Sequence, residues 1–480
     1  MRLRPLWARS AAFAAVAAWL LYFAHGGLGA SFTLDDVTNI CRYLQKPASA
    51  LWLDNLRFWS TAFRPFGALF YVPLYQVFGM NPLPYHIVSF ALLGLNLYLL
   101  YRFCLRLAGS REIAFLATFL ASYHAWFVDL YYNFSTIYDL LCYALYMGAF
   151  LLYAGIRSRG RTPGALQSLG VLLLYVLALD AKEMAATFPL FLLLYEIIYH
   201  GPAWREVRTW LVRECRTAWL AGAITLIYTV GKLTGPGSLI ENPAFALTVS
   251  PGRFLDVFHL YLNPLLYQEH RFHDSNTVQL LLVMLAFAAW RRSRPLLFAW
   301  FWLLLTILPV SFIAHYSGFF LYLPAAGWVL YAATVCVMAR RAMVRLASRL
   351  LSDGPALTRA SQAVLCVGLA GFLAPQHVRE RAKTLRIFMS IQPPSREIVG
   401  DLPRLAPTLR PGARVLFVGD PIPDDSYFLL FATRLTYRDL TIDVDRTRLQ
   451  PVPASAYSRY DAVFGFQDGH LIRLGGRASL

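Results

Sequence analysis

The sequence predicts an all-α polytopic membrane protein with about eleven transmembrane helices, interfacial helices in its outer loops and a small C-terminal α/β domain. Hydrophobic residues make up 58% of the 480 residues, and the mean hydropathy is +0.48, which is typical of membrane proteins. Apolar runs recur along the chain, and clusters of Arg separate them as in cytoplasmic loops. The formal charge of +17 therefore indicates membrane topology and not nucleic-acid binding.

The first apolar run, residues 11–24, follows three Arg residues, which favours a cytoplasmic amino terminus. The segment after this run should then emerge on the outer side. A cleavable signal peptide is the alternative, because the run is short and small residues follow it. Cleavage would place every later Arg cluster on the wrong side of the membrane, so we favour an uncleaved helix.

Ten further crossings are predicted, with the Arg clusters at alternate ends. They are residues 85–103, 113–128, 137–156, 166–181, 184–199, 218–231, 278–290, 296–314, 319–339 and 363–375. Two half-length apolar runs, residues 66–80 and 254–267, are too short to cross comfortably. Their Pro and aromatic residues favour helices that lie at the outer interface.

From about residue 376 the composition becomes that of a soluble domain, which divides the chain into residues 1–375 and 376–480. Residues 413–419 and 440–444 predict strands, and residues 464–474 predict a hairpin that turns at Asp468 and Gly469. We expect a small α/β domain on the outer face, with a role as an acceptor-binding domain or lid. No Gly-rich phosphate loop follows the first strand, and the six cysteines show neither a disulfide framework nor zinc-ligand spacing.

Two adjacent carboxylates, Asp35 and Asp36, follow the first apolar run. Carboxylates at a membrane surface are typical of a catalytic base placed where a lipid-borne substrate arrives. Asp is also a preferred residue at the start of a helix, so the pair could instead cap a helix that begins near Val37. The pattern alone leaves both interpretations open.

Four stretches together carry a resemblance to a known family. They are Phe32-Thr33-Leu34-Asp35-Asp36; Phe63-Arg64-Pro65-Phe66 with Gly79-Met80-Asn81-Pro82 and Tyr85-His86; Ala181-Lys182-Glu183-Met184; and Phe320-Leu321-Tyr322-Leu323-Pro324. In this order they resemble the membrane region of the GT-C superfamily of polyprenyl-phosphate-sugar-dependent glycosyltransferases. The closest resemblance is to the protein O-mannosyltransferases and to the transmembrane O-mannosyltransferases that bear tetratricopeptide repeats. The chain departs from these relatives in two ways: Gly318 and Phe319 stand where a Glu-Arg pair is frequent, and no tetratricopeptide array follows.

The resemblance implies an enzyme that transfers a sugar from a polyprenyl-phosphate donor to an extracytoplasmic hydroxyl in a single inverting displacement. Asp35 or Asp36 would be the base, and Arg64 and Lys182 would hold the departing phosphate. Alternatively, Lys182 is a snorkelling side chain paired with Glu183, and Arg64 is an interfacial anchor.

Several further polar residues receive supporting roles, with structural alternatives. The histidines of this set have three alternative roles: contact with the substrate, binding of a metal ion together with the Asp pair, or a structural place at the membrane interface with satisfied hydrogen bonds. Asp139 belongs to the site or bonds a neighbouring helix. The supporting set is Glu183, His86, His124, Asp139 and Tyr322, with His315 as a third histidine of the same kind.

The expected partners are the lipid-linked donor, membrane lipid and a protein, glycolipid or polysaccharide acceptor, with no nucleic acid. No cofactor is implied, and a divalent metal ion stays open. The expected location is a bacterial cytoplasmic membrane, with the active site and the C-terminal domain on the periplasmic side. The alternative functions are a transporter or flippase of lipid-linked glycans and a non-catalytic assembly partner. Ionisable residues at the outer helix ends argue against a transporter, whose binding groups lie near the midplane.

Overall fold

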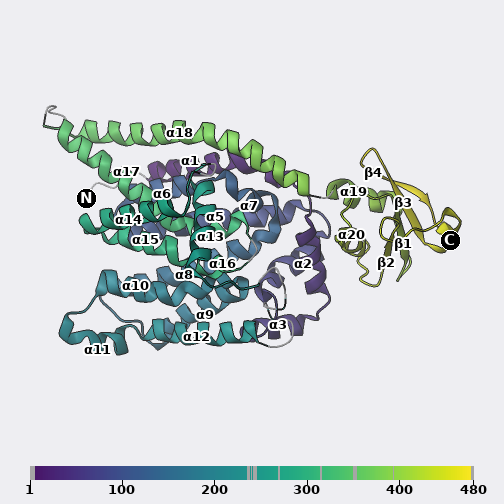
Figure 1. The fold of residues 1–480 in the computed structure, drawn as a ribbon, viewed down its shortest axis with the longest axis horizontal. Helices are drawn as coiled ribbons and strands as arrows, with labels where there is room; N and C mark the ends of the chain where they lie inside the picture. Colours follow the sequence, from purple (N-terminus) through teal and green to yellow (C-terminus); the bar gives the residue numbers. More distant parts are fainter. Residues whose placement is uncertain are drawn as a thin grey trace.

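The computed structural model of the chain describes residues 6–476 except 235–237, 239–240, 242–245, 269–270, 314–315, 350–353 and 393. A long helical body carries a small sheet domain at one end (Figure 1). The α-helices are α1 (Leu6–Ala24), α2 (Leu34–Leu44), α3 (Ala48–Leu56), α4 (Ala68–Phe78), α5 (Leu83–Ala108), α6 (Arg111–Ser122), α7 (Val128–Tyr132), α8 (Ile137–Arg157), α9 (Ala165–Ala181), α10 (Phe188–His200), α11 (Val207–Thr209), α12 (Arg216–Leu233), α13 (Pro251–Leu265), α14 (Asp274–Trp290), α15 (Arg294–Leu305), α16 (Leu308–Ser311), α17 (Ala325–Ala347), α18 (Gly354–Ile391), α19 (Ser395–Leu405) and α20 (Phe428–Thr436). The strands are β1 (Arg414–Val418), β2 (Asp443–Arg446), β3 (Ala462–Gln467) and β4 (His470–Gly475).

Within the described residues, five helical segments are long and apolar enough to cross a membrane. A sixth arises if α6 and the segment Ala125–Tyr132 count as one span, bent by 58°. The predicted crossing at residues 113–128 is therefore broken, because α6 ends at Ser122. The five remaining predicted crossings correspond to shorter or less apolar helices, among them α9 and α14. The two half-length runs form short helices, α4 of 11 residues and α13 of 15 residues.

Helix α18 continues past the predicted end of the membrane region. It contains Pro375 and runs on to Ile391, so the boundary predicted between residues 375 and 376 lies inside a helix. Among the polar residues that follow, His377, Glu380 and Thr384 are buried. This end of α18 packs against α7 and the short helix η3 (Ala125–Phe127). The sheet domain begins beyond α18.

The C-terminal domain contains a four-stranded sheet in the order β2-β1-β3-β4, with β1 parallel to both of its neighbours. The predicted hairpin is confirmed: β3 and β4 pair antiparallel, and both Asp468 and Gly469 have positive φ, as a two-residue hairpin turn requires. The second predicted strand was placed too early. It begins at Asp443, because the Asp439 carboxylate accepts hydrogen bonds from the backbone N–H groups of Thr441 and Gly412 and forms a turn there.

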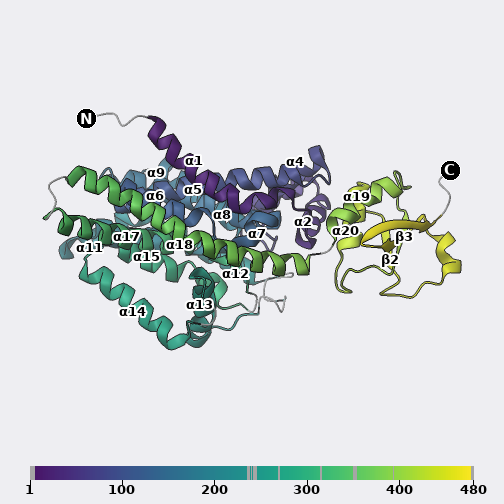
Figure 2. The same ribbon diagram turned by 90° about the horizontal axis from the view of Figure 1, so that it is seen from above.

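A close backbone contact positions the start of α2. The short helix η1 (His25–Gly29) packs against α7, and a Cβ on Gly27 would lie 1.9 Å from the backbone oxygen of Tyr131. Only glycine permits this approach. The acidic pair therefore follows a segment that is fixed against α7, while α2 itself packs against α20 of the C-terminal domain (Figures 1 and 2).

Candidate functional site

The first turn of α2 gives its two carboxylates different environments. Thr33 is the N-cap: its hydroxyl accepts from the Asp36 N–H at 3.3 Å, and Asp36 Oδ2 accepts from the Thr33 N–H at 2.8 Å. The two bonds form a reciprocal capping box, and the Asp36 side chain is fully buried. Burial raises the pKa of Asp36 well above its ordinary value, although the hydrogen bonds from Thr33 oppose the shift. The capping interpretation therefore describes Asp36.

Asp35 is exposed on the same turn and lines a cleft of about 570 Å³. One wall of the cleft is the start of α2 together with Asn133, which follows α7. The other wall comes from the region around the end of α18 and from the C-terminal domain. The residues of this second wall are Ser390, Gln392, Pro394, Pro421, Pro423, Asp425 and Ser426. An exposed carboxylate thus faces a cleft shared by the two parts of the chain.

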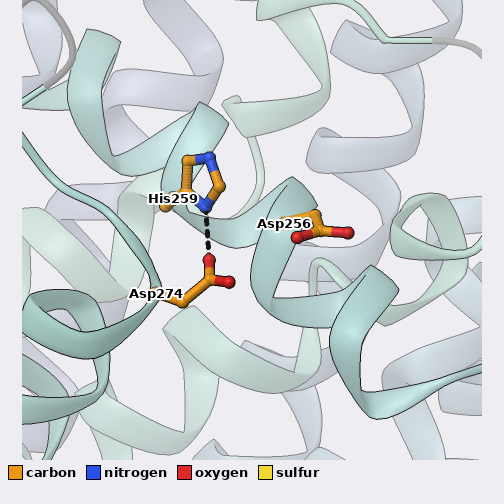
Figure 3. Close-up of side chains that lie close together, drawn as sticks. All are labelled: Asp256, His259 and Asp274. Atoms are coloured by element: carbon orange, nitrogen blue, oxygen red, sulfur yellow. Dashed lines mark hydrogen bonds and ion pairs between the residues drawn. The ribbon is translucent and has the colours of Figure 1, made fainter.

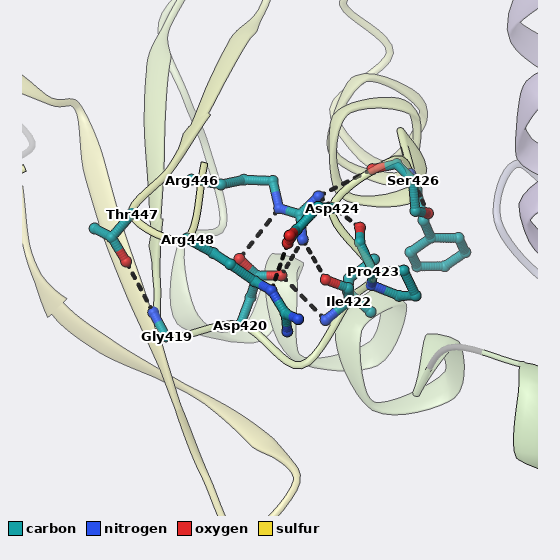
Figure 4. A network of polar contacts seen from close by, with 10 residues as sticks. Gly419, Asp420, Ile422, Pro423, Asp424, Ser426, Arg446, Thr447 and Arg448 are labelled. Atoms are coloured by element: carbon teal, nitrogen blue, oxygen red, sulfur yellow. Dashed lines mark hydrogen bonds and ion pairs between the residues drawn. The ribbon is translucent and has the colours of Figure 1, made fainter. Parts of the chain in front are cut away.

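The C-terminal wall of the cleft is a loop that Arg446 holds in place (Figure 4). Asp420 follows β1, Arg446 ends β2, and their side chains form a buried bidentate pair with N–O distances of 2.6 and 3.1 Å. The guanidinium also donates to the backbone oxygens of Ile422, Pro423 and Ser426. Because these contacts span the whole loop, the cleft wall has a fixed shape. The loop lies at the carboxyl ends of parallel strands, where α/β sheets commonly bind ligands.

The inner side of the cleft is formed by the segment that follows α7. The Asn133 side-chain oxygen accepts from the Ser135 N–H at 2.9 Å and lies 3.2 Å from the Thr33 hydroxyl. Asp129, on α7, lies close enough to Asp35 and Asp139 for the three charges to interact. Asp129 therefore connects the cleft electrostatically with the charged groups deeper in the helical body.

Those deeper groups form two ion pairs. The Arg64 guanidinium binds Glu183 with N–O distances of 2.5 and 3.2 Å, and the Lys182 ammonium lies 2.5 Å from Asp139. The Lys182 ammonium also lies over the rings of Phe319 and Phe320. Burial disfavours the charged form of Glu183, but Arg64 and Lys182 outweigh it and lower the pKa of Glu183 to about 2. The predicted pairing of Lys182 with the adjacent Glu183 is wrong, because each bonds a group that is distant in sequence.

The two predicted phosphate-binding cations differ in access. The Lys182 side chain is 0% exposed, so in this conformation it is closed to a ligand, whereas the Arg64 side chain is 15% exposed. Neither lines the cleft at Asp35. The structure therefore places Asp35 at one cleft and Arg64, Lys182, Glu183 and Asp139 in a separate cluster.

Buried tyrosines connect these two places. The Tyr43 hydroxyl donates to the backbone oxygen of Arg64 at 2.8 Å and lies 2.9 Å from the Tyr138 hydroxyl. The ring of Tyr71 stacks on Tyr43, and Asn39 of α2 donates to the Tyr71 hydroxyl at 3.5 Å. A continuous set of packed side chains therefore runs from α2 to Arg64.

A second cavity, of about 370 Å³, begins at Glu183. Its walls are mostly apolar, and its polar groups include Glu183 and Lys232. The Lys232 ammonium donates to the backbone oxygen of Ala62, close to Arg64 in sequence, at 2.5 Å. The apolar lining residues are Ala186, Leu190, Leu233, Leu247, Leu308, Pro309 and Ile313. The cavity thus combines an apolar wall with one acidic and one basic side chain.

The remaining predicted residues lie outside both cavities. His86 is buried and bonds a backbone carbonyl. His124 stacks on Tyr267 at 4.4 Å and bonds another backbone carbonyl. Tyr322 packs against Tyr143, and His315 lies outside the described residues. For His86 and His124 the contacts match the alternative of satisfied structural residues.

Sequence reasoning missed Lys232, Asn133 and the loop held by Arg446. Lys232 carries the signal that selected Lys182, a Lys at a predicted outer helix end. Asn133 and the loop carry no chemical signal, because they reach the cleft only through the packing of α2 on α20. In the part of the chain that the structure describes, the one group of three close metal-ligating side chains lies elsewhere, on α13 and α14.

Comparison with known protein families finds no family model that matches this sequence, and comparison with curated proteins finds no match either.

Proposed function

We propose that the chain is a membrane glycosyltransferase of the GT-C type, which transfers a sugar from a polyprenyl-phosphate donor to an extracytoplasmic hydroxyl. The observation that carries the proposal is the exposed carboxylate of Asp35, on the rim of a cleft that two parts of the chain enclose. A general base must reach the proton that it removes, and the position of Asp35 in the cleft wall supports such a role. Asp36, buried and capped, would hold the turn that presents Asp35.

In this proposal the acceptor enters the cleft beside Asp35, and the lipid tail of the donor occupies the cavity at Glu183. The two places are separate in this conformation, so transfer requires a rearrangement that brings the sugar of the donor to the acceptor beside Asp35. The isoprenoid tail would lie on the apolar wall, with Lys232 and Arg64 close to the phosphate. Arg64 already binds a carboxylate in bidentate fashion, and the same geometry suits a phosphate oxygen pair. The phosphate would have to replace Glu183 as the partner of Arg64. Lys182 would act indirectly, by neutralising Asp139.

The distribution of the basic loops supports the proposed sidedness. Glu112 and the Arg residues that follow α14 and end α17 line a common pocket, and Arg340 and Arg341 pair with Glu112. Figures 1 and 2 place α2 and the C-terminal domain at the end of the body opposite to the end where α17 is followed by α18. With the positive-inside rule and the eleven crossings that hydropathy predicts, we therefore propose that Asp35 faces the periplasmic side of a bacterial membrane.

The internal ion pairs favour one second candidate. Lys182 and Asp139 form a buried pair inside the helical body, and buried charge pairs between helices are also found in transporters. A transporter or flippase of lipid-linked glycans would use these charges without any covalent chemistry. A non-catalytic assembly partner would need neither Asp35 as a base nor the ion pair of Lys182 and Asp139.

The test is sugar transfer by the purified chain in liposomes that contain a polyprenyl-phosphate sugar, with envelope extract as the source of acceptor. Asp35→Asn should lower the rate by at least about 100-fold, the usual size of a general-base contribution. Asp54→Asn, which changes another carboxylate of the same predicted outer loop, should leave the rate within about twofold. Full activity in Asp35→Asn, Asp36→Asn and the double variant would overturn the proposal. Movement of the lipid-linked sugar between leaflets without transfer would instead support the transporter.

The acceptor class can be identified in cells. Mass spectrometry of envelope glycoproteins, glycolipids and polysaccharides from a deletion strain should show the loss of one sugar from one of these classes. An unchanged set of envelope sugars would argue for the non-catalytic partner.

A further inference from the structure

Three potential metal ligands lie close together on α13 and α14, away from the cleft at Asp35 and the cavity at Glu183. Asp256 and His259 are three residues apart on α13, so they share one face of that helix. Asp274 is the first residue of α14, which packs against α13. Figure 3 shows the His259 ring directed at the Asp274 carboxylate, with the Asp256 carboxylate beside them. One ligand atom from each residue lies within 4.8 Å of the other two.

The connection between the two helices is fixed by Asn263, one turn after His259. The Asn263 side-chain oxygen accepts from the Phe272 N–H at 2.9 Å, and its amide nitrogen donates to the backbone oxygens of Phe272 and His259 at 3.0 and 3.1 Å. These three bonds tie the residues just before α14 back onto α13. As a result, Asp274 Oδ1 lies 2.8 Å from His259 Nδ1. The position of Asp274 over α13 is therefore built into the turn.

The geometry points to a zinc-class divalent metal site made of Asp256, His259 and Asp274. One imidazole nitrogen and two carboxylate oxygens are a ligand set that suits Zn²⁺, whereas Mg²⁺ and Ca²⁺ prefer oxygen alone. Bonds of about 2.0 to 2.2 Å to a tetrahedral ion place ligand atoms roughly 3.4 Å apart. Since Asp256 and Asp274 are exposed, their side chains can close the remaining distance. The fourth position would hold water.

Metal binding would stiffen the segment between α13 and α14. Five described residues of this segment, among them Tyr267 and Arg271, line a separate cavity of about 580 Å³ together with His124 and His377. The Tyr267 hydroxyl also accepts from the Ala125 N–H at 2.9 Å. The ion would therefore fix a wall of this cavity. This inference does not depend on the proposed glycosyltransferase activity.

The direct test is metal titration of the purified full chain in detergent after treatment with a chelator. Zn²⁺ binding by calorimetry should show one ion per chain, and Co²⁺ should give the visible absorption bands of a four-coordinate site with a nitrogen ligand. Replacement of a ligand, in His259→Ala or Asp274→Asn, should weaken Zn²⁺ binding by more than about tenfold. Asp256→Asn should weaken it by about three- to tenfold, because this side chain has to move to reach the ion.

The matched control is His273→Ala, which removes an exposed histidine next to Asp274 and outside the three-residue group. It should bind Zn²⁺ within about twofold of the unmodified chain, with all variants eluting as the same species in size-exclusion chromatography. Proteolysis between residues 265 and 274 should also slow when Zn²⁺ is added, but not in His259→Ala. Absence of a stoichiometric ion, or equal binding by the unmodified chain and His259→Ala, would overturn the site.

Discussion

The cleft at Asp35 and the ion pairs around Lys182 both contain acidic side chains and both lie at the end of the helical body. They differ in whether the charged side chains are exposed or buried. At the cleft, Asp35 is exposed beside polar and Pro residues of the loop that Arg446 holds. In the cluster, Lys182 is fully buried and compensated by Asp139. Removal of one partner from a buried ion pair is strongly destabilising, whereas a general base has to be accessible to its substrate. The contrast is between an accessible carboxylate at the cleft and a buried ion pair in the cluster.

The largest effect should come from Lys182→Met. This change leaves Asp139 buried without its partner, and the free energy of unfolding should fall by about 3–5 kcal/mol. Denaturation of the purified chain in detergent measures it. Lys46→Met is the control: it breaks the more exposed pair with Asp54 and should cost less than about 1 kcal/mol. Equal losses in the two variants would show that Lys182 is not structural.

Arg446→Lys should have the next largest effect. It keeps the charge but loses the bidentate bond to Asp420 and the bonds to backbone oxygens, so the C-terminal domain should lose about 2–3 kcal/mol. Hydrogen exchange of residues 420–426 should accelerate accordingly. Arg448→Lys, in the exposed pair with Asp424, should change exchange little. Unchanged exchange in Arg446→Lys would mean that the cleft wall is held by other contacts.

The pH dependence of stability should differ in sign between the two regions. Glu183 has its pKa lowered from 4.5 to about 2, so its contribution is present above pH 4.5 and is lost as the pH falls toward 2. Glu183→Gln should therefore cost about 1–2 kcal/mol at pH 7, with the difference closing in acid. Asp36 has a raised pKa, so its contribution declines as the pH rises above 3.8, and Asp36→Asn should remove that decline. Unfolding of the unmodified chain and of the two variants, measured side by side at pH 3 to 8, would show the sign of each pH dependence.

The smallest effect on stability should come from Asp35→Asn, although it should have the largest effect on transfer. The side chain is exposed in the first turn of α2, where a negative charge stabilises the helix by less than about 1 kcal/mol. Thermal unfolding of this variant should therefore follow that of the unmodified chain closely. A large loss of stability would mean that Asp35, like Asp36, is a structural residue, and the contrast between the two regions would fail.

Local pattern was enough for much of the fold. Hydropathy predicted a mainly helical chain with long apolar helices, and the half-length runs became the short helices α4 and α13. The strand at residues 413–419 and the turn at Asp468 and Gly469 were also predictable, because strand alternation and positive φ depend on neighbouring residues alone. The change in composition at residue 376 falls inside α18, which continues to Ile391, so composition does not give the end of this helix.

The roles within the site depended on tertiary packing. Asp35 and Asp36 are adjacent in sequence and chemically identical, and both the base and the cap interpretation fitted the pair. Consecutive residues of a helix point about 100° apart, so the packing of α2 decides that Asp36 is buried and Asp35 is exposed. In the same way, sequence identified Lys182 and Glu183 as a charged turn, but their partners Asp139 and Arg64 lie 43 and 119 residues away. The packing of the helices in three dimensions decides which distant residues become partners. A local pattern of residues does not contain this information.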